Sequence, residues 1–484
     1  TGSLPTLSNT TLDSLLFINI QSNMFSSTLP VSFVEYWPHM VEIEFSNNYL
    51  TGTLPSAIEK LFHLTQLSAH HNSFSGNMPT TLCNFDKLHD ILIYNNMFTG
   101  SLLDCFNDEV FYIDFGYNLL EGSMPTMYDT LNKFKVLIVK NNYLTGYPVI
   151  PPNINTIDIS ANAFTGTLPI AAFNSTNLRN FIAADNCFSG SLSEDVCLAT
   201  SLSVLELTGV SAARTCSQTL LHIGDRSYSS KFLQGSVPEC LYTMPVMQDL
   251  YLSCNGFSGT IPNIAPDSLL SNISLSFNRL HGTIPMSLQE KVPMMRLIDL
   301  SYNRLTGVLS SPILNNSSPI LEHVVTLASN RLSGDIPQPY ISTSSSTNTN
   351  TNTDNFHHTD TYSTSIYNIL SGNMFACPYF TTNVLSGDDN SNKYACGSND
   401  LDLGLMAYSI VAGLVLALLF YISNYSATGE GVAGIEHEIC NNVPKWLKLY
   451  IFWKADSVSN GQSTQLNSSS NSSGSGNGNN NEIT

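Results

Sequence analysis

A short phrase returns along this chain at nearly constant spacing, and this repetition limits the folds that are open to it. The stretch NNYLTGTLP runs from Asn47 to Pro55, and variants such as NGFSGTIP and NRLSGDIP follow later. The Asn before each apolar-x-Gly step serves as a marker, and most markers are 22 to 25 residues apart. The markers are Asn23, Asn48, Asn72, Asn96, Asn118, Asn142, Asn162, Asn186, Asn255, Asn278, Asn303 and Asn330. A phrase repeated this often indicates a stacked architecture and not a catalytic motif.

Each unit follows the frame L-x-x-L-x-L-x-x-N-x-L-x-G-x-[LI]-P. Before Asn72, for example, the apolar positions hold Leu64, Leu67 and Ala69. The L-x-L part has a period of two, so it predicts a short strand with one apolar face. Stacked units bury that face between parallel strands about 4.8 Å apart. We expect the marker amide to bond backbone groups at the turn, Gly to supply a positive φ, and Pro to begin an irregular or 3-10 convex side.

The step of 69 residues that ends at Asn255 contains an insertion. The strand LSVLELTGV keeps the frame, but the marker position falls on Val210, and the phrase resumes with Lys231 in that position. A segment near 211–230 is therefore predicted to be spliced in at the turn. Because Val has no amide, the inserted loop or solvent must replace the bonds that a marker Asn would make.

A second insertion, near 340–360, is polar and of low complexity, so we expect it to be disordered. After it the frame is predicted to return at Asn368, Leu370 and Gly372. These readings give about fourteen repeats in one elongated domain, residues 1–376.

Charge and the two termini bound the class of protein. Only 11% of residues are charged and the formal net charge is −19, with no run of Lys or Arg, which argues against a nucleic-acid partner. The chain begins with TGSLP, the end of such a phrase, without Met or a Cys-bearing cap. We therefore expect a fragment that lacks its signal peptide, cap and first repeats.

Residues 403–422 are twenty residues without a charge, and a helix of that length spans about 30 Å, the thickness of a bilayer core. They predict one transmembrane helix, since a buried core helix would have little to pack against. Lys445, Lys448 and Lys454 follow the span, which places the C-terminus in the cytosol and the repeats outside. The tail, 423–484, is predicted to be disordered.

Small residues lie four apart in this span, at Ser409, Gly413 and Ala417. Such a stripe lets two membrane helices approach closely, so a co-receptor could pair there, although small residues are also common in such spans.

Sequons and cysteines agree with an extracellular repeat domain. The sequons lie at Asn9, Asn174, Asn272, Asn315 and Asn316. Cys377 and Cys396 flank the end of the last repeat and are expected to form a disulfide cap in a juxtamembrane region, 377–402. Cys216 lies in the first insertion and could pair with Cys197 or Cys240; scattered thiols are the alternative. The sequence contains no C-x-x-C pair, so a structural zinc site is not expected.

The frame with LTGTLP and its spacing resembles the plant-type leucine-rich repeats of receptor-like proteins and receptor-like kinases. Similar repeats occur in surface membrane proteins of protists. The resemblance covers the repeat region and implies a leucine-rich-repeat solenoid with short parallel strands. It departs from the receptor kinases, because the 62 residues after Ile422 hold no kinase motif. The layout is that of a receptor-like protein, and the resemblance leaves the ligand open.

No catalytic constellation or metal site is predicted. The pairs His70–His71 and His357–His358 lack a third ligand of fitting spacing. Side chains two, four and six positions before each marker should face the concave side, and on repeats two to six they form a charged and aromatic set. This predicted set is Glu42, Glu44, Gln66, His70, Asp90, Tyr94, Tyr112, Asp114 and Lys140.

Two functions fit these observations. The first is a receptor-like protein, not an enzyme and without a cofactor, whose concave face binds a peptide, protein or glycan through the predicted set. The second is a structural or adhesive surface-coat antigen shielded by glycans. Later repeats carry mostly Ser, Thr and Ala at the concave positions, with Asp249, Tyr251, Leu297 and Asp299 as exceptions. A clustered set on the earlier repeats favours binding.

Overall fold

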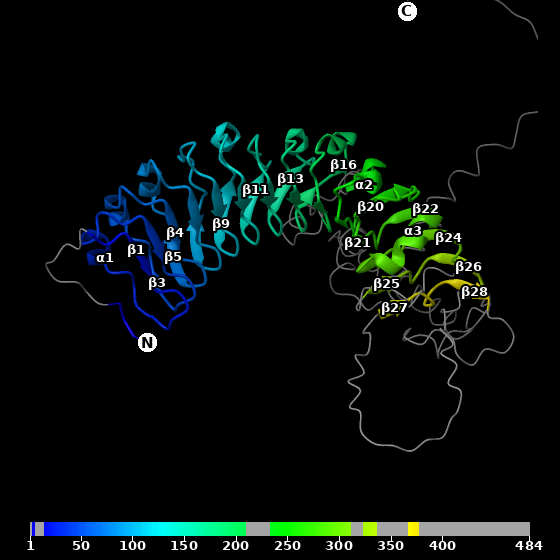
Figure 1. Ribbon diagram of the computed structural model, residues 1–484, viewed down its shortest axis with the longest axis horizontal. Coiled ribbons are helices and arrows are strands. Elements are labelled where there is room, and N and C mark those ends of the chain that lie inside the picture. The colour runs from blue at the N-terminus through cyan, green and yellow to red at the C-terminus, as the bar shows by residue number, and fades with distance from the viewer. Residues whose placement is uncertain (1, 5–13, 210–232, 311–322, 336–365, 377–484) are drawn as a thin grey trace, which may run out of the picture.

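The computed structural model describes residues 2–4, 14–209, 233–310, 323–335 and 366–376, which form a curved solenoid (Figure 1). A parallel sheet of fourteen strands lines its concave side in the order β1-β2-β4-β6-β8-β10-β12-β14-β17-β19-β21-β23-β25-β27. The strands are β1 (Phe17–Asn19), β2 (Glu42–Glu44), β4 (Gln66–Ser68), β6 (Asp90–Leu92), β8 (Tyr112–Asp114), β10 (Val136–Ile138), β12 (Thr156–Asp158), β14 (Asn180–Ile182), β17 (Val204–Glu206), β19 (Asp249–Tyr251), β21 (Asn272–Ser274), β23 (Leu297–Asp299), β25 (Val324–Thr326) and β27 (Ile366–Asn368).

The register repeats from strand to strand, so equivalent residues form columns. Ile43 pairs with Leu67, and Leu67 with Ile91, and all three are buried in the core. The residues on either side of each central residue point to the concave face because side chains alternate along a strand. The predicted parallel-strand solenoid is confirmed.

The marker Asn side chains form the ladder that the sequence predicts at the turn. The Asn118 amide nitrogen donates to the carbonyls of Ile93, Phe115 and Gly116 at 3.1–3.2 Å. Its carbonyl oxygen accepts from the Phe98 backbone N–H at 3.0 Å. One side chain thus satisfies backbone groups in its own repeat and in the repeat before it, which a buried turn would otherwise leave unpaired.

The residue before the marker was not foreseen as a special position. In twelve repeats this residue is not glycine and still adopts a left-handed φ of 50 to 58°. Its types are as diverse as His71, Tyr117 and Ala161, so composition gives no signal. The carbonyl bonds made by the adjacent marker hold this uncommon conformation in place.

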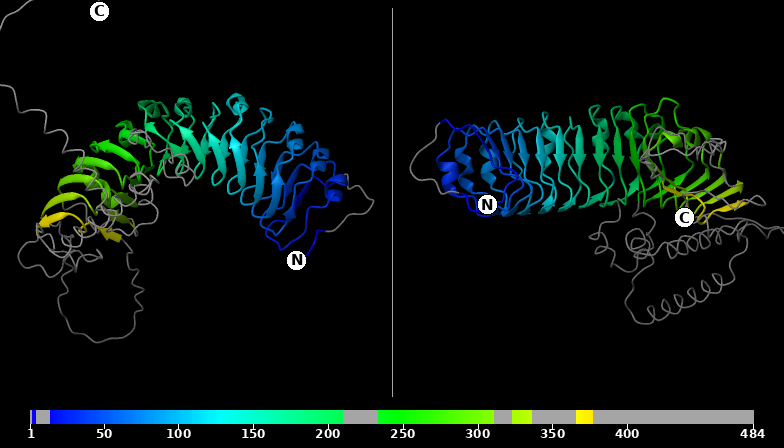
Figure 2. Two further views of the ribbon diagram at one scale, coloured as in Figure 1. Left: turned by 180° about the vertical axis from the view of Figure 1, so that it is seen from behind. Right: turned by 60° about the horizontal axis from the view of Figure 1, so that its bottom comes forward.

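Two further parallel sheets of seven strands are formed by strands that follow the turn, one in the upstream and one in the downstream repeats. Their orders are β15-β13-β11-β9-β7-β5-β3 and β16-β18-β20-β22-β24-β26-β28. Figure 2 shows the solenoid from two further sides. The strands of the first are β3 (Thr51–Gly52), β5 (Ser73–Asn77), β7 (Met97–Gly100), β9 (Leu119–Ser123), β11 (Tyr143–Gly146), β13 (Ala163–Gly166) and β15 (Cys187–Phe188). Those of the second are β16 (Gly190–Ser191), β18 (Leu233–Ser236), β20 (Gly256–Gly259), β22 (Arg279–Thr283), β24 (Arg304–Val308), β26 (Arg331–Asp335) and β28 (Met374–Ala376).

Short helices return the chain along the convex side, and most are 3-10 helices, as predicted. A Pro precedes many of them in extended conformation, for example Pro55 and Pro79. They are α1 (Val31–Glu35), η1 (Ser56–Lys60), η2 (Thr80–Asn84), η3 (Thr126–Thr130), η4 (Ile170–Asn174), η5 (Glu194–Leu198), α2 (Cys240–Thr243), α3 (Met286–Lys291) and η8 (Val292–Met294).

The concave sheet and the downstream seven-stranded sheet both continue through the interrupted region. Strand β17 pairs directly with β19, and β16 pairs with β18. Residues 210–232 therefore enter one repeat between its concave strand and its lateral strand. The Asn255 amide nitrogen donates to the Leu207 carbonyl at 2.8 Å, which links these two repeats directly.

The last marker differs from the prediction. Asn373, and not Asn368, accepts from the Leu332 backbone N–H at 3.0 Å and donates to the Leu327 carbonyl. Asn373 also donates to the carbonyl of Ile369, four residues before it. Other markers, such as Asn118, donate to the carbonyl of the residue three positions before them. One extra residue in this turn shifts the frame, so Asn368 ends strand β27 instead.

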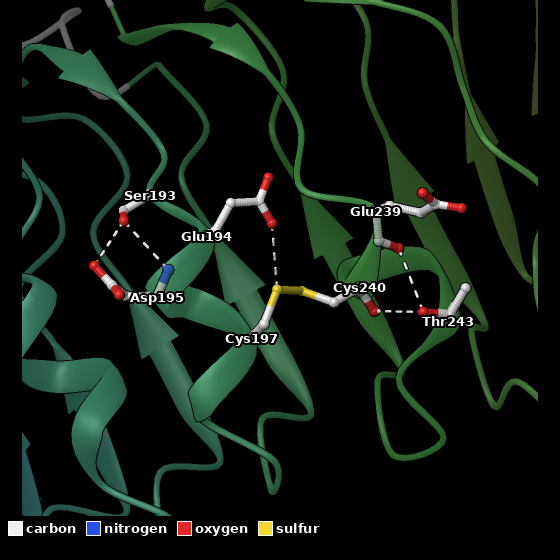
Figure 3. The surroundings of a disulfide bond; sticks show 7 residues. All are labelled: Ser193, Glu194, Asp195, Cys197, Glu239, Cys240 and Thr243. Atoms are coloured by element: carbon white, nitrogen blue, oxygen red, sulfur yellow. Dashed lines mark hydrogen bonds between the residues drawn. A yellow bond between two sulfur atoms is a disulfide. The ribbon is translucent and has the colours of Figure 1, made fainter.

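The disulfides correct the prediction for Cys216. Cys197 in η5 and Cys240 in α2 bond to each other, with Cα atoms 5.8 Å apart (Figure 3), so neither is available to Cys216. Cys83 and Cys105 form a second disulfide between adjacent repeats, with Cα atoms 5.3 Å apart.

Several predictions lie outside the described residues. They concern Asn9, Asn315, Asn316, the Cys377–Cys396 cap, the polar insertion, the span 403–422 and the tail. Across the described ranges, no helix is long and apolar enough to cross a membrane.

Candidate functional site

The concave sheet places all nine residues of the predicted set on one face. Strands β2, β4, β6, β8 and β10 are consecutive in the sheet, so the set occupies neighbouring strands or the turns that follow them. The register sets Glu42 beside Gln66, Gln66 beside Asp90, and Asp90 beside Tyr112. The grouping expected from the sequence therefore exists in space.

Aromatic rings form a compact group at the upstream end. The His70 ring stacks on Tyr94, with centroids 4.3 Å apart and an interplanar angle of 11°. His71 meets the same tyrosine edge-on at 5.1 Å. Burial is the main reason that the pKa of His70 is lowered, although Glu44 opposes the change. The stack offers a ligand apolar ring surface with polar tips.

Carboxylates surround these rings, and most have a local partner. Glu44 accepts from the Ser68 hydroxyl at 3.0 Å and from the Ser46 backbone N–H at 3.0 Å. Asp90 lies 3.2 Å from the ring nitrogen of the neighbouring His89.

Asp114 is the most buried carboxylate of the predicted set, with 8% of its surface exposed. Burial raises its pKa to about 6, and nearby Asp158 adds to the rise. The Gly116 backbone N–H, which donates to Asp114 at 3.0 Å, and the Lys140 ammonium oppose it. Burial prevails because removing the charged form from water costs more than these two contacts return.

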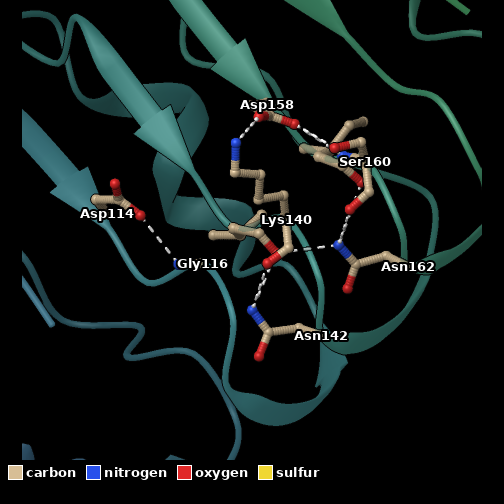
Figure 4. A network of polar contacts seen from close by, with 9 residues as sticks. Asp114, Gly116, Lys140, Asn142, Asp158, Ser160 and Asn162 are labelled. Carbon is tan, nitrogen blue, oxygen red and sulfur yellow. Dashed lines mark hydrogen bonds and ion pairs between the residues drawn. The ribbon is translucent and has the colours of Figure 1, made fainter. Parts of the chain in front are cut away.

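Lys140 makes an ion pair that the sequence analysis missed. Its ammonium lies 3.2 Å from Asp158, which is only 4% exposed (Figure 4). Asp158 also accepts from the Ser160 backbone N–H at 3.1 Å and from the Ser160 hydroxyl at 2.6 Å. The Lys140 ammonium also lies 5.6 Å from the centre of the Tyr117 ring. Asp158 stands four residues before its marker, so the column rule would have found it.

Glu206, at the end of β17, is a second missed carboxylate in the same column. Burial is the main cause of its raised pKa, and Asp158 and Asp185 add to it, whereas Lys140 opposes it. The acidic character of the face therefore continues beyond repeat six, where the predicted set ends.

The downstream half of the sheet has a different chemistry. The Ser253 hydroxyl bonds the Ser274 hydroxyl at 2.7 Å and accepts from the Ser276 hydroxyl at 3.0 Å. Asn272 points from the concave strand, as expected, and its amide donates to Asp249 at 2.5 Å. Its glycosylation stays a prediction, as does that of Asn174, the last residue of η4.

One downstream aromatic pair was missed: Phe277 and Tyr302 stack with ring centroids 4.1 Å apart. Both stand directly before a marker, a position that the column rule left out. Within the residues that the structure describes, no group of three or more His, Cys, Asp or Glu could hold a metal ion.

Comparisons with known proteins agree with this geometry. The family model described as Leucine Rich Repeat matches residues 39–61. Receptor-like protein 54 of Arabidopsis thaliana is 28% identical over 213 residues, which cover 39% of this chain and 24% of that protein. Receptor-like protein 7 of the same plant is 33% identical over 111 residues, which cover 22% of this chain and 11% of that protein. The chain thus matches a quarter or less of these relatives' length.

Two solved structures share the fold. The plant peptide hormone receptor RGFR1, in complex with RGF2, has a TM-score of 0.56 and 23% identity, covering 75% of this chain and 60% of that one. A TDR receptor has a TM-score of 0.52 and 22% identity, covering 75% of this chain and 65% of that one. The resemblance to plant leucine-rich-repeat receptor-like proteins is confirmed.

Proposed function

We propose that this protein is a cell-surface receptor-like protein that binds an extracellular peptide, protein or glycan on its concave face. In this proposal it has no kinase or other enzymatic activity. The observation that carries it is the gathering of aromatic and charged side chains on the consecutive strands from β2 to β10 and in the turns that follow them. Tyr and His rings beside carboxylates provide contact area together with directional bonds.

The relatives support this proposal by analogy. RGFR1 is a peptide hormone receptor and binds RGF2 on the same kind of scaffold. Because the identity is 23%, this likeness concerns the fold, and the ligand of our chain is inferred from its own residues.

The proposal also includes the location of the chain. We infer that residues 403–422 anchor it in the plasma membrane, with the repeats outside and the C-terminus in the cytosol. The proposal also includes signalling through a co-receptor. The stripe of small residues in the span offers it a contact.

A glycosylated surface coat is the second candidate, and the position of Asn272 favours it. A glycan at this sequon would project from the concave face and keep protein ligands from neighbouring repeats. The upstream strands lie several repeats away from Asn272. The receptor-like protein would bind its ligand on these strands, whereas a coat protein would bind none there.

The test is a random-peptide display library selected on the purified full-length chain. Selected peptides are then measured against two matched double variants, Tyr112→Ala with Asp114→Ala and Leu297→Ala with Asp299→Ala. Both pairs occupy the same two columns of the sheet, on β8 and β23. We expect the β8 pair to weaken binding at least tenfold and the β23 pair to leave it within about twofold.

If only the β23 pair weakens binding, the upstream site is wrong. A face that selects no peptide would favour the coat protein.

A further inference from the structure

We propose that the ligand of this face is an extended peptide with net positive charge, and that Lys140 acts as an internal competitor that sets its affinity. This inference rests on the proposed binding function and specifies the chemistry of the ligand. It follows from how charge is arranged on the unpartnered concave face.

Carboxylates dominate the face. In the described strands and the turns directly after them, the positions two, four and six before each marker hold a single Lys or Arg, Lys140. The carboxylates at those positions are Glu42, Glu44, Asp90, Asp114, Asp158, Glu206, Asp249 and Asp299. A ligand that complements this potential must be cationic, because a like-charged ligand would be repelled along the whole face.

Lys140 does not provide a site for an anion, because Asp158 already neutralises it. Their charged atoms are 3.2 Å apart, and the Asp158 carboxylate is buried. An anionic ligand that took Lys140 would leave Asp158 without a counter-ion in a poorly solvated place, which is costly. A cationic ligand faces the opposite situation, since its basic group can share or replace the ammonium beside Asp158.

The carboxylates also suggest a spacing. Asp114 on β8, Asp158 on β12 and Glu206 on β17 occupy one column, and each lies two strands from the next. With strands about 4.8 Å apart, Asp114 and Glu206 are separated by roughly 19 Å. An extended peptide covers that distance in about six residues. Two basic side chains about six residues apart would reach both ends of this column, with Lys140 and Asp158 between them.

Aromatic rings at the upstream end suit the same ligand. Tyr94 stacked with His70, and Tyr112 beside Asp90, present ring faces or edges close to carboxylates. Guanidinium and ammonium groups bind well where a ring and a carboxylate are adjacent.

The test uses two fluorescent dodecapeptides, one alternating Arg with Ser and one alternating Glu with Ser, and the purified full-length chain. Fluorescence anisotropy gives each Kd at low and at moderate salt. We expect the Arg peptide to bind more tightly by at least tenfold, and binding to weaken as salt increases.

Three variants locate the effect. Lys140→Met should strengthen binding of the Arg peptide about three- to tenfold, and Glu206→Gln should weaken it at least threefold. Lys133→Met is the matched control. The Lys133 ammonium lies 2.6 Å from a Glu109 carboxylate oxygen, so this variant also breaks an ion pair. It changes the net charge by the same amount, but away from the concave strands. It should change the Kd less than twofold. Circular dichroism melts verify that each variant is folded. If Lys140→Met does not fold, the result for Glu206→Gln decides the test.

Preferential binding of the Glu peptide, or loss of binding in Lys140→Met, would overturn the inference. So would equal gains in Lys140→Met and Lys133→Met, because attraction would then reflect net charge alone. Library-selected peptides that are uncharged but sensitive to the β8 variant would refute the cationic ligand and leave the proposed function standing.

Discussion

At the scale of single residues, Asp114 should make the stability of the protein depend on pH. Its folded-state pKa of about 6 lies above the ordinary 3.8, so the folded protein holds a proton that the unfolded chain has released between these values. The free energy of unfolding should therefore fall as pH rises from about 4 to about 6, by at most about 2 to 3 kcal/mol. Asp114→Asn keeps an acceptor for Gly116 and should remove this slope.

Urea unfolding followed by circular dichroism from pH 4 to 7.5 measures the effect. Asp299→Asn is the control, because Asp299 occupies the same column on β23 and bonds Ser301 in its turn. The slope should persist in that variant. An unchanged slope in Asp114→Asn would assign the pH dependence to other groups.

At the scale of elements, the Cys197–Cys240 disulfide ties η5 to α2 on either side of the insertion. It closes a loop of 43 residues, whereas Cys83–Cys105 closes one of 22. Because a cross-link restricts the unfolded chain more when its loop is longer, Cys197→Ser with Cys240→Ser should cost about 4 kcal/mol, and the other pair about 3 kcal/mol. Urea unfolding of both double variants measures this.

Reductant should also lower the free energy of unfolding of the unmodified chain, because it breaks the same disulfides. If the Cys197→Ser, Cys240→Ser variant unfolds at the same urea concentration as the parent, the strand pairs β16–β18 and β17–β19 suffice to hold the two repeats together.

At the scale of the whole molecule, each repeat contacts mainly its neighbours, so one repeat should be removable. Deleting 279–303 joins Asn278 to Arg304, and Asn330 can then take the backbone partners that Asn303 held in the repeat before it. We expect a cooperative melt within about 10 °C of the parent, and peptide binding upstream unchanged.

Deleting 279–290 removes only part of a repeat and is the control. It leaves a strand without a matching return path, so the downstream repeats should lose their structure. Equal melting of the two deletion variants would show that register does not govern this solenoid.

The repeat, its strands and the marker turn could be predicted from the amino-acid sequence, because these depend on residues within one unit. Leu64, Leu67 and Ala69 are all buried, and Asn72 makes the turn bonds expected of it. The position of the first insertion also follows from the local frame. Since every concave residue has a fixed offset from its marker, the candidate face could be drawn from the sequence.

Contacts between residues of different repeats became visible only in the folded chain. The Lys140–Asp158 ion pair and the Cys197–Cys240 disulfide each join positions from separate repeats. The role of Asn373 as a marker depends on one extra residue in its turn. The pKa of Asp114 is likewise set by burial within the stack. Stacking brings residues more than fifteen positions apart within a few ångströms. Fixed offsets show which side chains share a column, but the pattern within one repeat does not show which of them bond to each other.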